Sequence, residues 1–164
     1  MRAIRVSGIG LAAVLCLADP LHPQDFDHLR VDGQRVETTH GLRIAFSAPP
    51  DLVPLGETHF RESYGGPSFD VSATAFTNDS VLLAAHAETH TDESGGLDYS
   101  DLPPDTLGGR ILNSRIDCFD LREESAEDVE GNGFLRFLRG AGFDFQRAFV
   151  LKRFYLVNAD GTSE

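Results

Sequence analysis

The stretch FDVSATAFTNDSVLLAAHAETH, residues 69–90, carries the clearest structural pattern in the chain. Residues 69–76 place an apolar side chain at every second position, and residues 81–90 repeat this spacing. Such alternation is typical of a β-strand that is buried on one face. The turn-forming residues Asn78, Asp79 and Ser80 separate the two runs, so the stretch predicts an antiparallel β-hairpin.

Weaker alternation continues on both sides of this hairpin. It predicts further strands at 35–39, 42–46, 58–63, 110–119 and 147–157. Residues 91–109 contain several acids together with Gly95-Gly96 and Pro103-Pro104, and we expect them to form a long surface loop. Loops of that length are uncommon unless they are functional or mobile.

Residues 122–139 are the best helix candidate. Acidic residues gather in the first turns, and Arg136 and Arg139 lie in the last, which matches the helix dipole. The sequence therefore predicts an α+β fold, in which an antiparallel, mostly meandering sheet of six or seven strands carries one helix from the C-terminal half on one face. The alternative is a β-sandwich or barrel with a peripheral helix.

The last predicted strand is apolar on both faces, which is typical of an interior strand with a neighbour on each edge. Residues 158–161 form a turn signal, and three residues follow it. We therefore expect that a C-terminal return strand is absent from this sequence. The alternative is an edge strand beside a natural terminus.

The first eighteen residues have the features of a secretory signal peptide. Arg2 and Arg5 precede an apolar run over residues 9–18, and Asp19-Pro20 follows. The run is shorter than the roughly 20 apolar residues that cross a bilayer. We expect cleavage after Ala18 and export to the periplasm or the cell exterior. A lipid anchor at Cys16 is the less favoured alternative, and a buried N-terminal helix is another.

After cleavage, 19–34 would be a polar arm and 35–164 a single globular domain. The whole chain has 14 Lys and Arg residues against 26 Asp and Glu, a net charge of −12. Loss of the two arginines in residues 1–18 makes the net charge −14, which opposes binding to nucleic acid or anionic lipid. Cys118 becomes the single cysteine. Its phase with Leu112 and Ile116 predicts burial, and pairing with another chain or with a cysteine beyond this sequence is the alternative.

One cluster of possible metal ligands is present. On a strand, His86, Glu88 and His90 point to one face, with successive Cα atoms about 7 Å apart. Two imidazoles and a carboxylate suit zinc or non-haem iron. No fourth ligand is identifiable, and the alternative is a solvated strand face. The acids of 92–105 lack the spacing of a calcium loop.

No catalytic motif stands out in the sequence, so we expect a protein that is not an enzyme and needs no cofactor. The favoured function is an exported module that binds a ligand or a partner. The first alternative is a metal-binding protein or metal-dependent enzyme that uses the cluster of His86, Glu88 and His90 with zinc or iron. The second is an envelope assembly component that offers a strand edge for β-augmentation.

Overall fold

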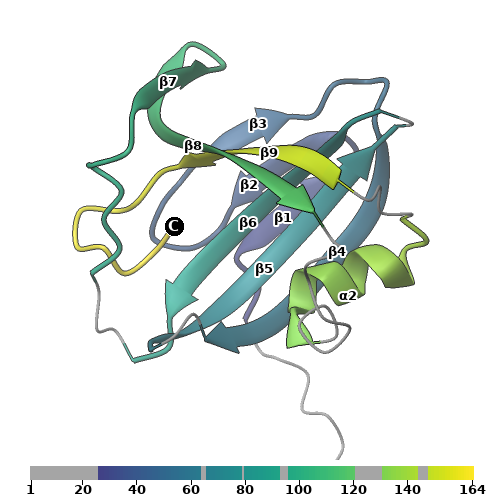
Figure 1. Cartoon of the computed structure of the whole chain (residues 1–164). Coiled ribbons are helices and arrows are strands. Elements are labelled where there is room, and N and C mark those ends of the chain that lie inside the picture. Colours follow the sequence, from purple (N-terminus) through teal and green to yellow (C-terminus); the bar gives the residue numbers. More distant parts are fainter. Residues whose placement is uncertain (1–25, 64–65, 79, 93–95, 121–130, 144–147) are drawn as a thin grey trace, which may run out of the picture.

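The computed structural model describes residues 26–63, 66–78, 80–92, 96–120, 131–143 and 148–164. The predicted signal peptide and the first half of the predicted helix lie outside these residues. The described part contains nine strands in three antiparallel sheets of three strands each (Figure 1). None of the described helices is long and apolar enough to cross a membrane.

Each sheet follows chain order. The first contains β1 (Leu29–Asp32), β2 (Arg35–Thr38) and β3 (Ala45–Ser47); the second contains β4 (Val53–Ser63), β5 (Ser68–Thr77) and β6 (Leu82–His90); the third contains β7 (Pro104–Leu107), β8 (Arg110–Asp120) and β9 (Ala148–Tyr155). The described helix is α2 (Gly133–Gly140), which lies beside β4. In Figure 1 the β8–β9 pair crosses in front of the second sheet, and the first sheet lies behind it.

The predicted central hairpin is confirmed. β5 and β6 pair without interruption from Phe69 opposite His90 to Thr77 opposite Leu82. The side-chain oxygen of Asn78 accepts hydrogen bonds from the main-chain N–H groups of Ser80 and Val81, both at 2.9 Å. A side chain that caps its own turn in this way favours a tight reversal.

One face of this hairpin packs against the first sheet. Leu29 of β1, Val36 of β2, Phe76 of β5 and Ala87 of β6 are each at most 2% exposed and belong to one apolar cluster. The two sheets therefore share one apolar core. The other face packs on α2, where Phe134 contacts the cluster that contains Phe60.

The start of α2 fits closely against β4. Asn132 caps the helix, and its side-chain oxygen accepts from the N–H of Leu135 at 2.9 Å. A Cβ added at Gly133 would lie only 2.4 Å from the ring of Phe60, so only glycine fits there without rearrangement. This contact fixes the helix on the sheet.

The architecture corrects the sequence prediction in several places. A mostly antiparallel β-fold with a short helix is confirmed, but the described strands form three sheets and not one sheet of six or seven strands. Residues 48–52 and 91–103 connect the sheets; Pro49-Pro50 and Pro103 favour breaks between strands because proline cannot donate to a ladder. The third sheet begins with β7, inside the expected loop 91–109.

The boundary of the predicted N-terminal arm also moves. Residues 29–32 of the expected arm 19–34 form β1, which pairs with β2 from Leu29 opposite Thr38 to Asp32 opposite Arg35. Leu29 is 2% exposed because its side chain enters the core between the two sheets. The domain therefore begins before residue 35.

Candidate functional site

The C-terminal residues lie along the outer edge of β6. The N–H of Glu88 donates to the carbonyl of Glu164 at 2.8 Å, and the N–H of Glu164 donates to the carbonyl of Glu88 at 3.0 Å. The N–H of His90 donates in the same way to Thr162 at 3.0 Å. Residues that exchange both hydrogen bonds are directly opposite in an antiparallel pair, so the side chains of Glu88 and Glu164 share one face.

The two carboxylates lie in a largely buried setting. Glu88 is 8% exposed, and the Glu164 carboxylate accepts a hydrogen bond from the Tyr99 hydroxyl at 2.5 Å. Burial raises the pKa of Glu164 to about 7; the charge of Glu88 adds to the rise, while the Tyr99 hydrogen bond and Arg153 oppose it. Burial also raises the pKa of Tyr99. A carboxyl group that titrates near neutrality is a common feature of functional sites.

Two further contacts hold this segment in place. The ring of Tyr99 stacks on Tyr155 of β9 with centroids 4.1 Å apart. His40 Nε2 lies 2.8 Å from the main-chain oxygen of Glu164, and its Nδ1 lies 3.1 Å from the carbonyl of Leu42. The segment is thus tied to β6, to the loop around Tyr99 and to the loop after β2.

The predicted metal cluster is divided between two environments. His86 Nδ1 lies 3.5 Å from Glu88 Oε1, and the His86 ring contacts Phe134 of α2 at 4.3 Å between centroids. His90 is 4% exposed; it packs on Phe69 with ring centroids 4.4 Å apart, and its Nδ1 lies 3.8 Å from Asp92. The strand does place all three on one face, as predicted.

Within the described residues, no three His, Cys, Asp or Glu side chains converge in a group that could hold a metal ion. Metal binding by His86, Glu88 and His90 therefore stays a prediction. Elemental analysis of the purified protein, with melting in the presence and absence of EDTA, tests it.

The rest of the outer edge of β6 has open main-chain groups. Because Glu88 and His90 direct their N–H groups outward, the alternation of an antiparallel ladder also directs those of His86 and Ala84 outward. No described residue supplies a hydrogen-bond partner to these groups. The side chains of His86 and Ala84 are exposed as well. This edge, Leu82–His86, is called the open edge below.

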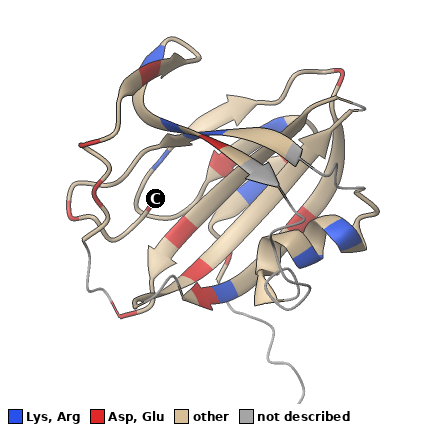
Figure 2. Ribbon diagram, in the orientation of Figure 1, with Lys and Arg blue, Asp and Glu red and all other residues tan. Residues whose placement is uncertain are grey.

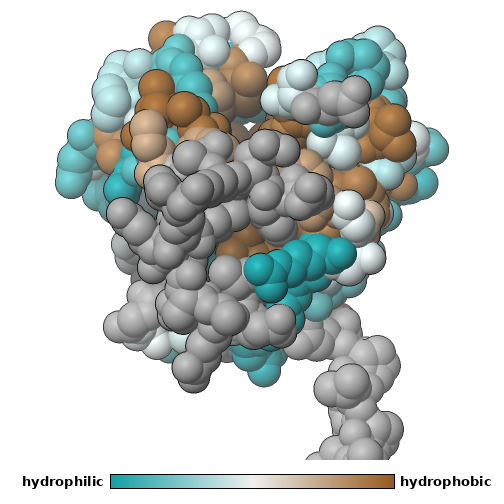
Figure 3. Space-filling model, turned by 45° about the vertical axis from the view of Figure 1, so that its right-hand side comes forward, coloured by the Kyte–Doolittle hydropathy of each residue, from teal (hydrophilic) through white to brown (hydrophobic). Residues whose placement is uncertain are grey.

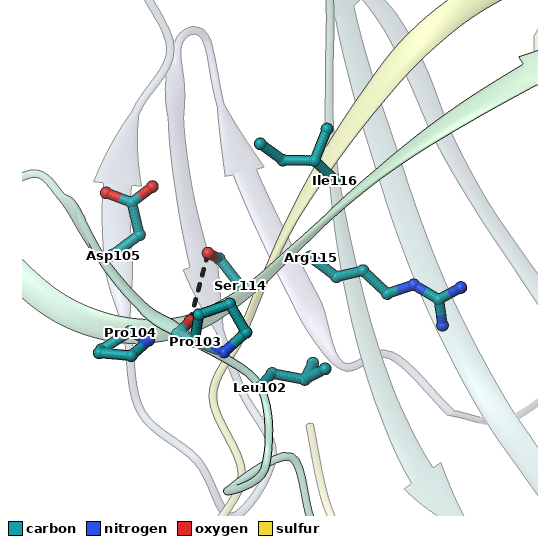
Figure 4. A pocket seen from close by; sticks show the side chains of 7 residues that line it. All are labelled: Leu102, Pro103, Pro104, Asp105, Ser114, Arg115 and Ile116. Carbon is teal, nitrogen blue, oxygen red and sulfur yellow. Dashed lines mark hydrogen bonds between the residues drawn. The ribbon is translucent and has the colours of Figure 1, made fainter.

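Two shallow hollows lie near the third sheet. One, of about 410 Å³, lies between β7 and β8, where Ser114 Oγ donates to the carbonyl of Pro103 at 3.4 Å and Arg115 extends away from Asp105 (Figure 4). The other, of about 460 Å³, lies beside Tyr99 and Tyr155. Neither contains the His86 and Glu88 pair.

Some apolar side chains are exposed at the surface. Figure 3 shows such patches on one face, among hydrophilic surface. The large exposed apolar residues of the described part are Val53, Val81, Leu107, Ile111, Ile116 and Val150. Cys118 is a free, exposed thiol close to two of them, because it pairs with Val150 and lies two residues after Ile116. Its predicted burial is therefore wrong.

Sequence reasoning did not identify Tyr99, Glu164 or His40 as members of this site. Tyr99 and Glu164 are 65 positions apart, and His40 and Glu164 are 124 apart. No local motif links residues at such separations. Comparison with protein-family models, with curated proteins and with solved structures gave no significant match.

Proposed function

We propose that this chain is an exported, non-catalytic module that binds another polypeptide by accepting an extended strand at the open edge of β6. One observation supports the proposal: the outer edge of β6 is paired over Glu88–His90 and, within the described part of the chain, unpaired over Leu82–His86. The segment Thr162–Glu164 already lies on the paired part. The edge therefore has the geometry to receive a strand, and a strand added there would satisfy exposed main-chain groups.

The composition of the open edge also favours strand addition. Soluble proteins usually protect a sheet edge with lysine, proline, a bulge or a covering segment. The sequence of β6, LLAAHAETH, contains neither lysine nor proline, and its pairing with β5 has no bulge. An alanine-rich edge without a bulge is well suited to main-chain recognition of a partner.

Export is supported by the sequence pattern of residues 1–18. A periplasmic or extracellular location would bring the open edge into contact with other exported or envelope proteins. The intact mass of the exported form tests this part of the proposal. A mass that corresponds to residues 19–164 is expected, and recovery of full-length chain from the cytoplasm alone would contradict it.

Strand addition is tested by blocking the outward N–H of Ala84. Ala84→Pro removes this donor without removing a hydrogen bond between β5 and β6, whereas Ala84→Val keeps the N–H and serves as the matched control. Partners captured from an envelope or secreted fraction are identified, purified and measured again with each variant. We expect binding to be lost in Ala84→Pro and kept in Ala84→Val, with similar circular dichroism and melting. Equal binding by a folded Ala84→Pro protein would overturn the proposal.

A further inference from the structure

We infer that the strand accepted at the open edge runs antiparallel to β6, with apolar side chains opposite Ala85 and Leu83 and a lysine or arginine opposite His86. This inference rests on the proposed strand addition and specifies its partner: an extended segment of another protein, basic at its first paired residue and alternately apolar after it.

The direction and register come from the segment already paired with β6. Thr162–Glu164 runs antiparallel to β6, with Ser163 opposite Thr89 and Glu164 opposite Glu88. A strand that continues this line meets His86 first and Leu82 last. It exchanges main-chain hydrogen bonds with His86 and Ala84, the residues whose N–H and C=O groups point outward.

The apolar positions follow from the face that packs on the first sheet. Ala85 and Leu83 are half-buried and pack against the core cluster that contains Phe76 and Ala87. Phe46 of β3 is also half-buried against this cluster. Cross-strand neighbours share a face, so incoming side chains opposite Ala85 and Leu83 extend this apolar layer. Since alanine is small, branched side chains such as valine would have room beside it.

The basic position follows from the opposite face. A side chain opposite His86 lies on the same face of the sheet as Glu88 and Glu164. It is a diagonal cross-strand neighbour of Glu88, and it occupies the next position on this face beyond Glu164 along the line of the added strand. Glu88 is 8% exposed, and the charges of the two carboxylates act on each other. An incoming cation would offset their repulsion. Arg153 also acts on Glu164 from β9, the His86 ring lies 3.5 Å from the Glu88 carboxylate, and the His40 ring lies 2.8 Å from the main-chain oxygen of Glu164.

The overall charge distribution is consistent with a basic partner. The chain has a net charge of −12, so a cationic segment would be attracted over a long range. Acidic residues outnumber basic ones on the β4–β6 sheet, where Arg61 is the one basic residue of the strands, while the strands of the third sheet carry residues of both signs (Figure 2). The open edge is on the acidic side of this distribution.

The test uses ten-residue synthetic peptides with a fluorophore at the C-terminus. The first begins Lys-Val-Thr-Val-Thr, the second replaces the lysine with methionine, and the third shifts the alternation to Lys-Thr-Val-Thr-Val. Fluorescence anisotropy with the intact protein measures each affinity. We expect the first peptide to bind about tenfold more tightly than either of the others. The methionine peptide loses one partly desolvated charge pair, and the shifted peptide loses the apolar contacts opposite Ala85 and Leu83.

Two variants of the protein test whether Glu88 causes the preference for a basic residue in the peptide. Glu88→Gln is expected to remove most of the difference between the lysine and methionine peptides, and Glu57→Gln, at an exposed acid of β4, is expected to leave it unchanged. Hydrogen exchange of the amides of Ala84 and His86 should slow when the first peptide is bound. Equal binding of all three peptides with slowed exchange would overturn the side-chain inference and leave strand addition standing. No binding by any peptide, with no change in exchange, would count against strand addition itself.

Discussion

Tyr99 donates its phenolic hydrogen to the carboxylate of Glu164, with the two oxygens 2.5 Å apart. This bond joins the loop after β6 to the segment that pairs with the same strand. It is reinforced by main-chain contact, because the N–H of Leu97 donates to the carbonyl of Gly161 at 3.1 Å. The half-paired edge of β6 is thus held at one end by a side chain whose protonation changes near neutral pH.

The first prediction concerns Glu164 and the pH dependence of stability. Burial raises the pKa of Glu164 from an ordinary value of 4.5 to about 7, so the folded protein holds this proton more tightly than the unfolded chain. The resulting stabilisation is fully present below about pH 4.5 and is lost as the pH rises through about 7. In Glu164→Gln this fall should disappear, which makes the variant more stable than the wild type at pH 8 by on the order of 1–3 kcal/mol.

Urea denaturation at intervals from pH 4 to pH 8 measures this effect as the difference between the two free energies of unfolding. Glutamine keeps an acceptor for Tyr99, so the hydrogen bond itself is preserved. A difference that stays constant across the pH range would contradict the prediction.

The second prediction concerns His28, whose pH effect has the opposite sign. Burial is the main cause that lowers the pKa of His28 below 6.5, and His40 and His59 add to it while Asp70 and Asp27 oppose it. The folded protein therefore releases this proton more readily than the unfolded chain. Its stabilisation is present above about pH 6.5 and is lost as the pH falls.

The His28→Gln variant should therefore lose less stability between pH 7 and pH 5 than the wild type. Thermal melting across this range measures the loss. The prediction is wrong if His28→Gln and the wild type show parallel melting curves against pH.

The central hairpin could be predicted from sequence because its signal is local. Residues 69–90 contain both strands and the turn, so alternation and turn chemistry agree within 22 positions. Two other hairpins have turn residues that could have predicted them, although the alternation of apolar side chains did not. The two-residue turn Gly33-Gln34 joins β1 and β2 with φ of +58° at Gly33, and Gly108-Gly109 joins β7 and β8 with φ of +57° and +79°. A glycine with positive φ at the first position of a two-residue turn is typical of a β-hairpin.

The candidate site could not be predicted because its parts meet only in the folded chain. Alternation placed Glu88 on the correct face of β6 but gave no information about Glu164 or Tyr99. The same limit explains Cys118. Alternation along a strand shows which side chains share a face, but it does not show which face the rest of the protein covers. Ile116, which lies on the same face of β8 as Cys118, is 62% exposed.

The third prediction follows from the exposed position of Cys118. In the form that comprises residues 19–164, where Cys118 is the single cysteine, a thiol-specific reagent should modify one equivalent in the absence of denaturant and about the same number after unfolding. Cys118→Ser should abolish the reaction and change the free energy of unfolding by less than about 0.5 kcal/mol, since an exposed side chain contributes little packing. Reaction only after denaturation would mean that the thiol is covered in the protein.

The last prediction concerns the contact between Gly133 and Phe60. In Gly133→Ala the new methyl group would lie 2.4 Å from the ring of Phe60, so the helix or the ring must move. We expect a loss of about 1–3 kcal/mol in the free energy of unfolding, as for other overpacked contacts. Gly140→Ala is the matched control at the other end of α2, because a methyl group there would have no atom within 4 Å. That variant should stay within about 0.5 kcal/mol of the wild type. Urea denaturation measures the free energy of unfolding of both variants, and the denaturation slopes should be equal. If the two variants were equally stable, α2 would not depend on close packing against β4.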